Sequence, residues 1–392
     1  MMKHNNMITI LMFPWLAHGH ISPFLELAKK LTLRNFFIQF CSTPTNLTSI
    51  EQKLAAAAAD NQSEIFFSES IQLVGLNLPN LPELPPHYHT TKRLPPHLMP
   101  TLKKAFEMVK PEFSNILKEL NPDLVIYDII QPWVPETALV HNIPAVEFVS
   151  TGAAMTSFML HKSKNPGADF PFKEIYLRGY EEAQIAHLME FSLDPRKDRD
   201  RPGECLERSV DIVLIKTCKE IEGKYFDYLS ELLGKKIVPV GAIVEEIVVS
   251  EEEVDNKNSS IMEWLNKKDR CSIVFVSFGI RFPAGNQEMR VEGALPDGFL
   301  ERVGEKGKGM VVKGLDPQAK ILVHENVGGF VVKDEEGRIQ REKLATASKQ
   351  VILEESGGDL RRNARLLSEK IRSKGEEEID VVAEELVKIC KK

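Results

Sequence analysis

Two residues of this sequence, His20 and Asp128, could carry out acid–base chemistry together. His20 follows the apolar run ITILMF at 8–13, and Asp128 lies near the end of the apolar run DLVIYDII at 123–130. Both runs are predicted to be buried strands, and ligands of open α/β sheets bind at the carboxyl ends of the strands. A carboxylate beside an imidazole fixes the imidazole tautomer and stabilises the imidazolium that forms when the ring takes a proton. The pair therefore suits a general base that acts on a hydroxyl, although a histidine in a turn is more often structural than catalytic.

The elements that must position this pair alternate along the first part of the chain. Short apolar runs are separated by helical patterns, which predicts a parallel sheet with helices on both faces. In the first helix, Ser22 is predicted to be the N-cap and Pro23 the first helical residue. We expect strands at 8–13, 36–43, 123–130 and 145–149, and helices at 22–31 and 101–120.

Length and composition narrow the class of protein. A chain of 392 residues is too long for one small core, so we predict two domains. The net charge of −7 and the lack of a basic stripe with interleaved aromatic residues argue against a nucleic-acid partner. The five cysteines show neither metal-ligand spacing nor a disulfide framework, which suits a reducing compartment.

The N-terminal apolar run is better explained by a strand than by a signal peptide. Pro14 and Gly19 interrupt the run, and no small-residue cleavage site follows it. No segment approaches the roughly 18 apolar residues that a membrane span needs. We therefore expect a cytoplasmic protein without a membrane span.

The domain organisation follows from the composition along the chain. We predict a first domain at 1–240, an acidic linker at 241–260, a second domain at 261–375, and a C-terminal helix at 376–392 that could pack back on the first domain. The second domain offers only about three convincing strands, whereas a doubly wound domain typically has five or six.

Other motifs of the sequence support few alternative functions. The Pro- and Leu-rich segment 75–100 is predicted to be a lid or pocket wall, or else a surface excursion. The sequence has neither a phosphate-binding Walker loop nor a G-x-S-x-G nucleophile elbow. A glycoside hydrolase would need paired carboxylates, and no such pair lies at predicted strand ends.

Several motifs together resemble plant UDP-sugar-dependent glycosyltransferases. They include PWLAHGHISPFLELAKKL, PDLVIYDIIQPW, VPVGAI, VFVSFG and GGFV, and the resemblance runs in order from about residue 8 to 390. The closest likeness is to the branch that adds a sugar to an existing glycoside. The resemblance implies the GT-B fold, in which two Rossmann-like, doubly wound domains face each other across a cleft. The acceptor would bind to the N-terminal domain and the nucleotide sugar to the C-terminal domain.

The resemblance also implies roles for individual residues. His20 matches the catalytic base of an inverting mechanism, and Asp128 matches the carboxylate that pairs with it. The implied acceptor-binding residues are Trp15, His97 and Trp133, and the implied donor-binding residues are Ser150, Gly279, Gln318 and His324. For the two tryptophans, ordinary packing is an equal alternative.

The sequence departs from the family pattern in the donor-binding region. Leu315 stands where the family has a tryptophan that stacks on uracil. After Val332 the rest of the donor-binding signature is missing, and Gly279 is joined directly to Ile280 where the family has a further helix and strand. The second domain is therefore predicted to be incomplete. Either the sequence omits segments of the whole molecule, or the chain is a truncated or engineered acceptor-binding protein without catalytic activity.

The resemblance implies a set of binding partners. UDP-sugar would be a co-substrate, with glucose as the family default, and neither a metal nor another cofactor is expected. The acceptor is predicted to be a small-molecule glycoside of flavonoid or terpenoid type. We expect a monomer.

Overall fold

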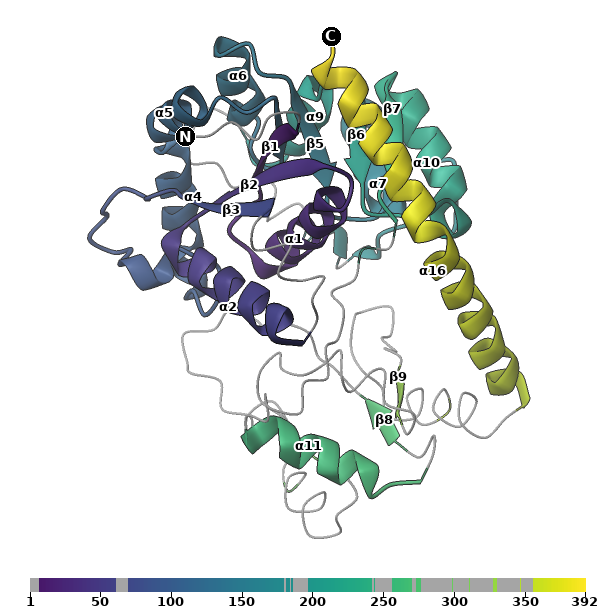
Figure 1. Ribbon diagram of the computed structural model, residues 1–392. Coiled ribbons are helices and arrows are strands. Elements are labelled where there is room, and N and C mark those ends of the chain that lie inside the picture. The colour runs from purple at the N-terminus through teal and green to yellow at the C-terminus, as the bar shows by residue number, and fades with distance from the viewer. Residues whose placement is uncertain are drawn as a thin grey trace. The chain divides into compact units, whose positions relative to one another are not determined.

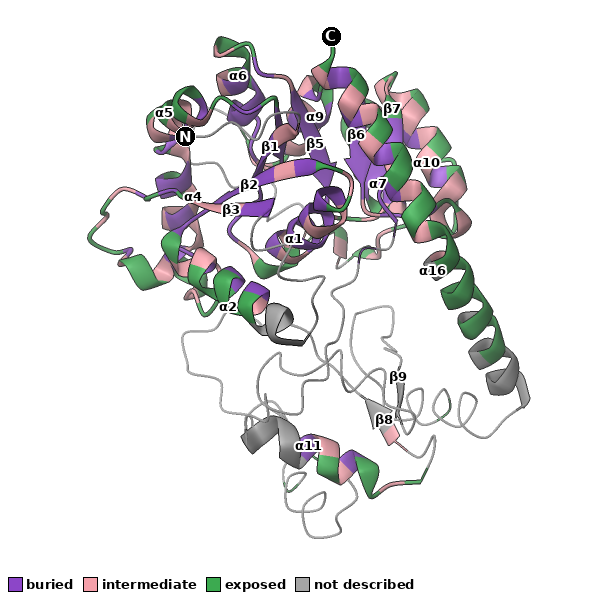
Figure 2. Ribbon diagram, viewed as in Figure 1, coloured by how far each residue is buried: buried purple, intermediate pink, exposed green. Residues whose placement is uncertain are grey.

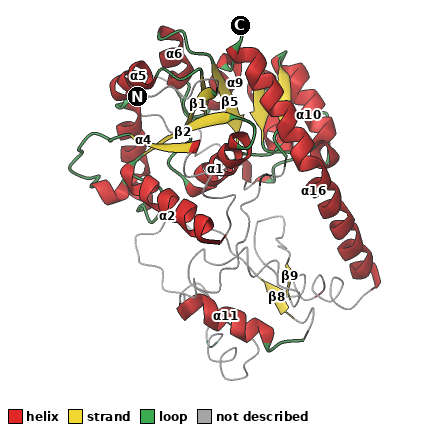
Figure 3. Cartoon of the chain, in the orientation of Figure 1, coloured by secondary structure: helices red, strands yellow, loops and turns green. Residues whose placement is uncertain are grey.

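The computed structural model of this chain describes residues 7–60, 70–179, 181–183, 185, 197–241, 243, 256–269, 273–275, 298, 310, 327–329, 346 and 355–392. The chain divides into two compact units. The first comprises Met1–Glu246 and Leu366–Lys392, and the second comprises Ile247–Arg365. Helices and strands alternate along most of the first unit (Figure 3).

A seven-stranded parallel sheet forms the centre of the first unit, in the order β3-β2-β1-β4-β5-β6-β7 (Figure 1). The strand order reverses between β1 and β4, which is the topological switch point of a doubly wound sheet. The predicted parallel sheet is thus confirmed. The strands are β1 (Ile8–Phe13), β2 (Phe36–Ser42), β3 (Ile71–Gly75), β4 (Leu124–Tyr127), β5 (Ala145–Val149), β6 (Ile212–Ile215) and β7 (Lys236–Pro239).

Helices cover both faces of this sheet, because side chains of successive strand residues point to opposite faces. In β1, Ile10 and Met12 belong to one buried apolar cluster, while Leu11 and Phe13 belong to another. Figure 2 shows the strands largely buried and the outer faces of the helices exposed. The helices of the first unit are α1 (His18–Thr32), α2 (Pro44–Asp60), α4 (Met99–Glu107), α5 (Lys110–Leu120), α6 (Trp133–Val140), α7 (Ala153–Lys164), α9 (Arg201–Arg208) and α10 (Lys219–Leu233), together with the 3₁₀ turns η1 (Pro86–Tyr88) and η2 (Pro96–Leu98).

Two predicted helix boundaries were wrong. The first helix begins at His18 with Ala17 as its N-cap, and Pro23 therefore lies inside it. A proline at this position has no N–H to donate to the carbonyl of Gly19, four residues earlier, and its ring crowds that carbonyl. The helix predicted at 101–120 is two helices, because Pro111, in the first turn of α5, has no N–H to donate to the carbonyl of Glu107, where α4 ends.

The C-terminal part of helix α16 (Glu355–Cys390) packs on the first unit. Ile379, Val382 and Leu386 are buried in the same apolar cluster as α1 and β1. Ion pairs hold the edges of this contact, since Arg34 Nε lies 2.6 Å from Asp380 Oδ1 and Lys236 Nζ lies 3.0 Å from Glu385 Oε1.

The described part of the second unit is smaller. Strands β8 (Ile273–Phe275) and β9 (Val327–Gly329) pair in parallel. Helix α11 (Asn256–Asn266) begins inside the stretch predicted to be a linker. The joins at 279–280 and 332–333 lie outside the described residues, and so does the predicted incompleteness of this domain. Among the residues that the structure describes, no helix is both long and apolar enough to cross a membrane.

Candidate functional site

The Asp128 side chain lies at the switch point of the sheet, one residue beyond the end of β4. It is completely buried, and its carboxylate accepts two backbone hydrogen bonds. Trp15 N–H donates to Oδ2 at 2.9 Å, and Ile129 N–H donates to Oδ1 at 2.8 Å. These amides follow the ends of β1 and β4, where the ladder of sheet hydrogen bonds has stopped. The strand ends therefore supply the donors that make a buried carboxylate tolerable.

His20 lies against this carboxylate from the first turn of α1. Its Nδ1 is 2.9 Å from Asp128 Oδ2 and 3.0 Å from Oδ1. Because a carboxylate only accepts hydrogen bonds, Nδ1 carries the proton, and Nε2 of the neutral ring keeps its lone pair. The His20 side chain is 25% exposed, so a substrate can reach it while its partner stays buried. This geometry is that of an oriented general base.

The electrostatics of the pair favour the protonated imidazole. Burial lowers the pKa of His20, but the charge of Asp128 and the hydrogen bond to it outweigh burial and raise the pKa above its ordinary value of 6.5. A raised pKa means that the ring binds a proton more firmly once it has taken one. The dyad can therefore hold a proton that it removes from a substrate.

Ser150 completes the group from the end of β5. Its Oγ lies 3.3 Å from His20 Nδ1, so three neighbouring strand ends converge on one imidazole. The resemblance placed Ser150 near a donor sugar, and the structure shows its contact with His20. No local pattern indicates this contact, because serine after a buried strand is common in turns.

The two predicted acceptor-binding tryptophans pack in the apolar core, which was the alternative for them, and their contact with an acceptor stays a prediction. The Trp133 side chain is fully buried, and its ring packs edge-on against Phe113 with centroids 5.5 Å apart. The Trp15 side chain is 6% exposed and packs edge-on against Phe106. Trp15 contributes to the site through its backbone N–H, which periodicity in the sequence does not reveal. His97 is exposed on η2, and its predicted contact with an acceptor stays a prediction.

The other predicted donor-binding residues belong to the second unit. Gly279, Gln318 and His324 lie outside the described residues, and their roles also stay predictions. Within the described part of the chain, no group of three or more His, Cys, Asp or Glu residues is arranged to hold a metal ion.

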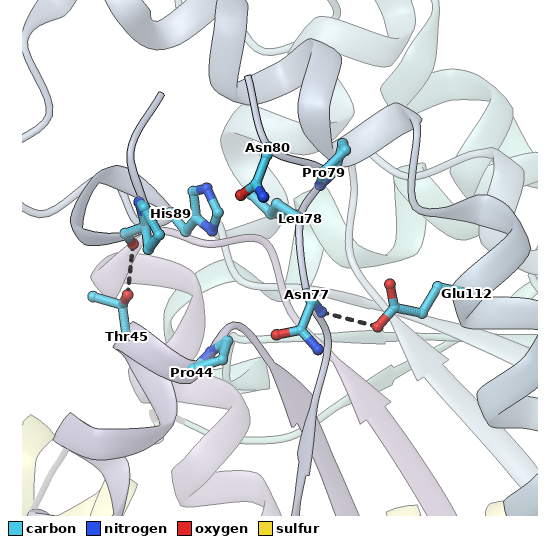
Figure 4. A pocket seen from close by; sticks show the side chains of 9 residues that line it. Pro44, Thr45, Asn77, Leu78, Pro79, Asn80, His89 and Glu112 are labelled. Atoms are coloured by element: carbon cyan, nitrogen blue, oxygen red, sulfur yellow. Dashed lines mark hydrogen bonds between the residues drawn. The ribbon is translucent and has the colours of Figure 1, made fainter. Parts of the chain in front are cut away.

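The Pro- and Leu-rich segment 75–100 reaches the same edge of the sheet. Thr91 N–H donates to Leu16 O at 3.0 Å, which ties the segment to the residues between β1 and α1. A cavity of about 460 Å³ lies beside it (Figure 4). Pro44, Thr45, Asn77, Leu78, Pro79, Asn80, Pro86, His89 and Glu112 line the cavity, whereas His20 and Asp128 do not. The segment thus forms a pocket wall, at a place separate from the dyad.

Comparison with known proteins identifies relatives over the whole chain. Residues 6–244 match the family described as "Glycosyltransferase, N-terminal domain". The chain is 42% identical to "UDP-glucosyltransferase 29" of Panax ginseng, over 100% of this chain and 98% of the relative. It is 38% identical to "Flavanone 7-O-glucoside 2''-O-beta-L-rhamnosyltransferase" of Citrus maxima, over 100% and 99% of the two chains.

A solved structure supports the same relationship at the level of the fold. UGT73P12 of Glycyrrhiza uralensis, complexed with glycyrrhetinic acid 3-O-monoglucuronide, is similar with a TM-score of 0.75. The identity is 18%, and the likeness covers 98% of this chain and 96% of the other. This likeness confirms the GT-B fold predicted from the sequence.

Proposed function

We propose a reaction for this chain, which belongs to the plant UDP-glycosyltransferase family: it transfers a sugar from a UDP-sugar to a hydroxyl of a small-molecule glycoside. The observation that carries the proposal is the buried Asp128 carboxylate that fixes the tautomer of the partly exposed His20 ring.

The chemical step uses the lone pair on His20 Nε2. The acceptor hydroxyl gives its proton to Nε2 while its oxygen attacks the anomeric carbon of the donor sugar. The new carbon–oxygen bond forms as the bond to the UDP oxygen breaks, and UDP leaves with that electron pair. A single displacement of this kind inverts the configuration at the anomeric carbon. Asp128 stabilises the imidazolium that results, as buried carboxylates do in other oriented dyads.

The acceptor class comes from the relatives. The Citrus maxima relative is named for adding rhamnose to a flavanone glucoside, and the Panax ginseng relative is named for transferring glucose. These names support a glycoside acceptor for this chain and leave several donor sugars open. We propose glucose as the donor, with Gly279, Gln318, His324 and Ser150 on the donor side and His97 on the acceptor side. We also propose that the protein works as a monomer in the cytoplasm.

A second function is favoured by a specific observation. The alignment with the Panax ginseng relative is 456 positions long, although this chain has 392 residues, so the relative carries residues that this chain lacks. The sequence places such losses in the donor-binding signature after Val332 and at Gly279. A chain without those residues would bind an acceptor glycoside but hold UDP-sugar weakly.

Titration calorimetry with UDP-glucose, followed by a transfer assay with a flavanone 7-O-glucoside, separates the two functions. For the transferase we expect micromolar binding of UDP-glucose and a flavanone product that carries a disaccharide. Acceptor binding without measurable UDP-glucose binding would support the second function and exclude the first.

The dyad is tested within the same assay. His20→Ala should nearly abolish transfer and leave the affinity for UDP unchanged. His141→Ala is the matched control, because His141 follows α6 and precedes β5, at the opposite edge of the sheet, where it contacts Ser114. Near-normal turnover of His20→Ala would remove His20 from the mechanism.

A further inference from the structure

A second carboxylate lies at the strand-end edge of the sheet, in Glu222 of α10. One Glu222 oxygen, Oε2, accepts the backbone N–H of Ala153 at 2.7 Å, and Oε1 accepts the backbone N–H of Ala154 at 3.1 Å. Thr217, which follows β6, donates its hydroxyl to Oε2 at 2.5 Å. Glu222 therefore caps the first turn of α7 with a side chain from another helix.

The backbone of α10 is distorted at this residue. Glu222 has φ −122° and ψ 18°, which is not helical, although it lies inside the helix Lys219–Leu233. The Glu222 carboxylate, which lies at this kink, accepts two of its three hydrogen bonds from the first turn of α7.

The turn between β5 and α7 is shaped to receive the carboxylate. A Cβ added to Gly152 would lie 2.7 Å from both Glu222 oxygens, which is closer than real Cβ atoms approach. Any side chain at this position would push the carboxylate away from the α7 amides. The turn of residues 150–152 is thus held at one end by β5, whose Val149 O accepts Lys216 N–H at 2.9 Å, and at the other end by Glu222.

This turn carries Ser150, whose Oγ lies 3.3 Å from His20 Nδ1. We propose that Glu222 is a positioning residue for the transfer reaction, because it fixes the turn that holds Ser150 against His20. Ser150 acts as a second acceptor for the Nδ1 proton beside Asp128, and it stabilises the imidazolium that forms during transfer. This inference rests on the proposed role of His20 as the base.

Three variants test the proposal. Glu222→Gln removes one of the two side-chain oxygens that accept backbone N–H groups of α7. Gly152→Ala displaces the carboxylate while leaving its charge in place. Ser150→Ala removes the group through which Glu222 is proposed to act. Each should lower kcat about two- to tenfold, the size expected for one hydrogen bond, with the KM for the acceptor unchanged. Glu231→Gln is the control, because Glu231 is exposed on the same helix.

A double-mutant cycle gives the decisive comparison. If Glu222 acts through Ser150, Glu222→Gln in the Ser150→Ala background should lower kcat no further. The pKa of His20, followed by NMR titration of its ring, should fall in each single variant and fall no further in the double variant. A Glu222→Gln effect of the same size in both backgrounds would overturn the proposal, and so would an unchanged His20 pKa. The NMR measurement needs no turnover. It therefore decides this inference even for a chain that fails to transfer sugar, a failure that would refute the proposed function.

Discussion

Asp128 and Glu147 are two carboxyl groups on neighbouring strands that are equally buried and differently used. Both side chains are 0% exposed. Glu147 lies in the middle of β5, paired in register with Tyr127, the last residue of β4, and Asp128 follows Tyr127 beyond the end of that strand. Asp128 accepts hydrogen bonds from two backbone amides and from His20, whereas both Glu147 oxygens lack a hydrogen-bond partner among the described residues. The comparison teaches that position relative to the strand end decides what a buried carboxyl group can do.

The physical reason is the supply of backbone donors. Within a strand, the sheet ladder uses the N–H groups, and beyond its end they are free for a side chain. The two environments also differ in charge. Burial raises the pKa of Glu147 well above its usual range, and the charge of Asp128 raises it further, while Lys235 opposes the shift. Burial and the charge of Asp128 thus both favour the neutral form of Glu147.

The largest expected effect comes from substituting Asp128, the carboxylate that contacts His20. Asp128→Asn should lower kcat about 10²- to 10⁴-fold, because the amide no longer stabilises the imidazolium and can present a donor to Nδ1. Glu147→Gln is the matched control, since it changes an equally buried carboxyl group on the adjacent strand, and its kcat should stay near that of the unmodified protein. Steady-state kinetics with saturating UDP-sugar measure both. Equal losses in the two variants would mean that burial, and not the contact with His20, explains the effect.

The pH dependence sharpens the same contrast. The base must be neutral to accept a proton, so activity is present above the pKa of His20 and is lost as pH falls through it. Because Asp128 raises this pKa above 6.5, the acid limb of kcat/KM should lie above pH 6.5. In Asp128→Asn only burial remains as a major influence, so the limb should move to lower pH. In Glu147→Gln the limb should stay in place, and a shift there as large as in Asp128→Asn would contradict the assignment.

Much of this site could be predicted from the sequence. The apolar runs before His20 and Asp128 predicted strands, and parallel strands place their carboxyl ends on one edge, so the pair could be expected to meet. The parallel sheet and the helices on both faces followed from the same alternation, which predicted β1, β2, β4 and β5 of its seven strands. These features depend on periodicity and order along the chain, which a sequence contains.

Other features depend on tertiary contacts that have no local signal. For Trp133 the sequence left acceptor contact and ordinary packing as equal alternatives, and three phenylalanine rings from β1, α4 and α5 pack against its ring. The capping of α7 by Glu222 joins residues 69 positions apart, and the kink in α10 that permits it has no proline to announce it. The start of α1 was misplaced because Ser22 and Pro23 form a typical N-terminal signal inside a longer helix.

The next largest effect concerns Glu147, whose carboxyl oxygens lack a hydrogen-bond partner among the described residues. Glu147→Met should raise the free energy of unfolding at pH 8 by about 1–3 kcal/mol, the cost of a buried polar group without hydrogen bonds. A carboxyl group whose folded pKa is raised stabilises the fold fully only below its unfolded pKa of about 4.5, and this contribution is lost as pH rises. The advantage of the variant should therefore be smaller at pH 4 than at pH 8.

Denaturant unfolding at the two pH values measures this effect. Glu112→Met is a suitable control, because the Glu112 side chain is only partly buried and accepts the backbone N–H of Asn77. That substitution should not stabilise the protein. A Glu147→Met variant that is less stable at pH 8 would show that Glu147 has a structural role which its contacts do not reveal.

The smallest expected effects come from two serines, one that contacts the backbone of Glu147 and one that contacts His20, the partner of Asp128. Ser209 is 2% exposed, accepts the backbone N–H of Glu147 at 2.8 Å and donates to Ile212 O at 2.5 Å, so its hydroxyl supports the backbone. Ser209→Ala should lower the free energy of unfolding by about 1 kcal/mol and leave the pKa of His20 unchanged. Ser150→Ala should do the opposite, with unchanged stability and a lower His20 pKa. Thermal unfolding and NMR titration of the two variants check the crossed pattern, and a Ser209→Ala protein with a shifted His20 pKa would show that the two carboxyl environments are coupled.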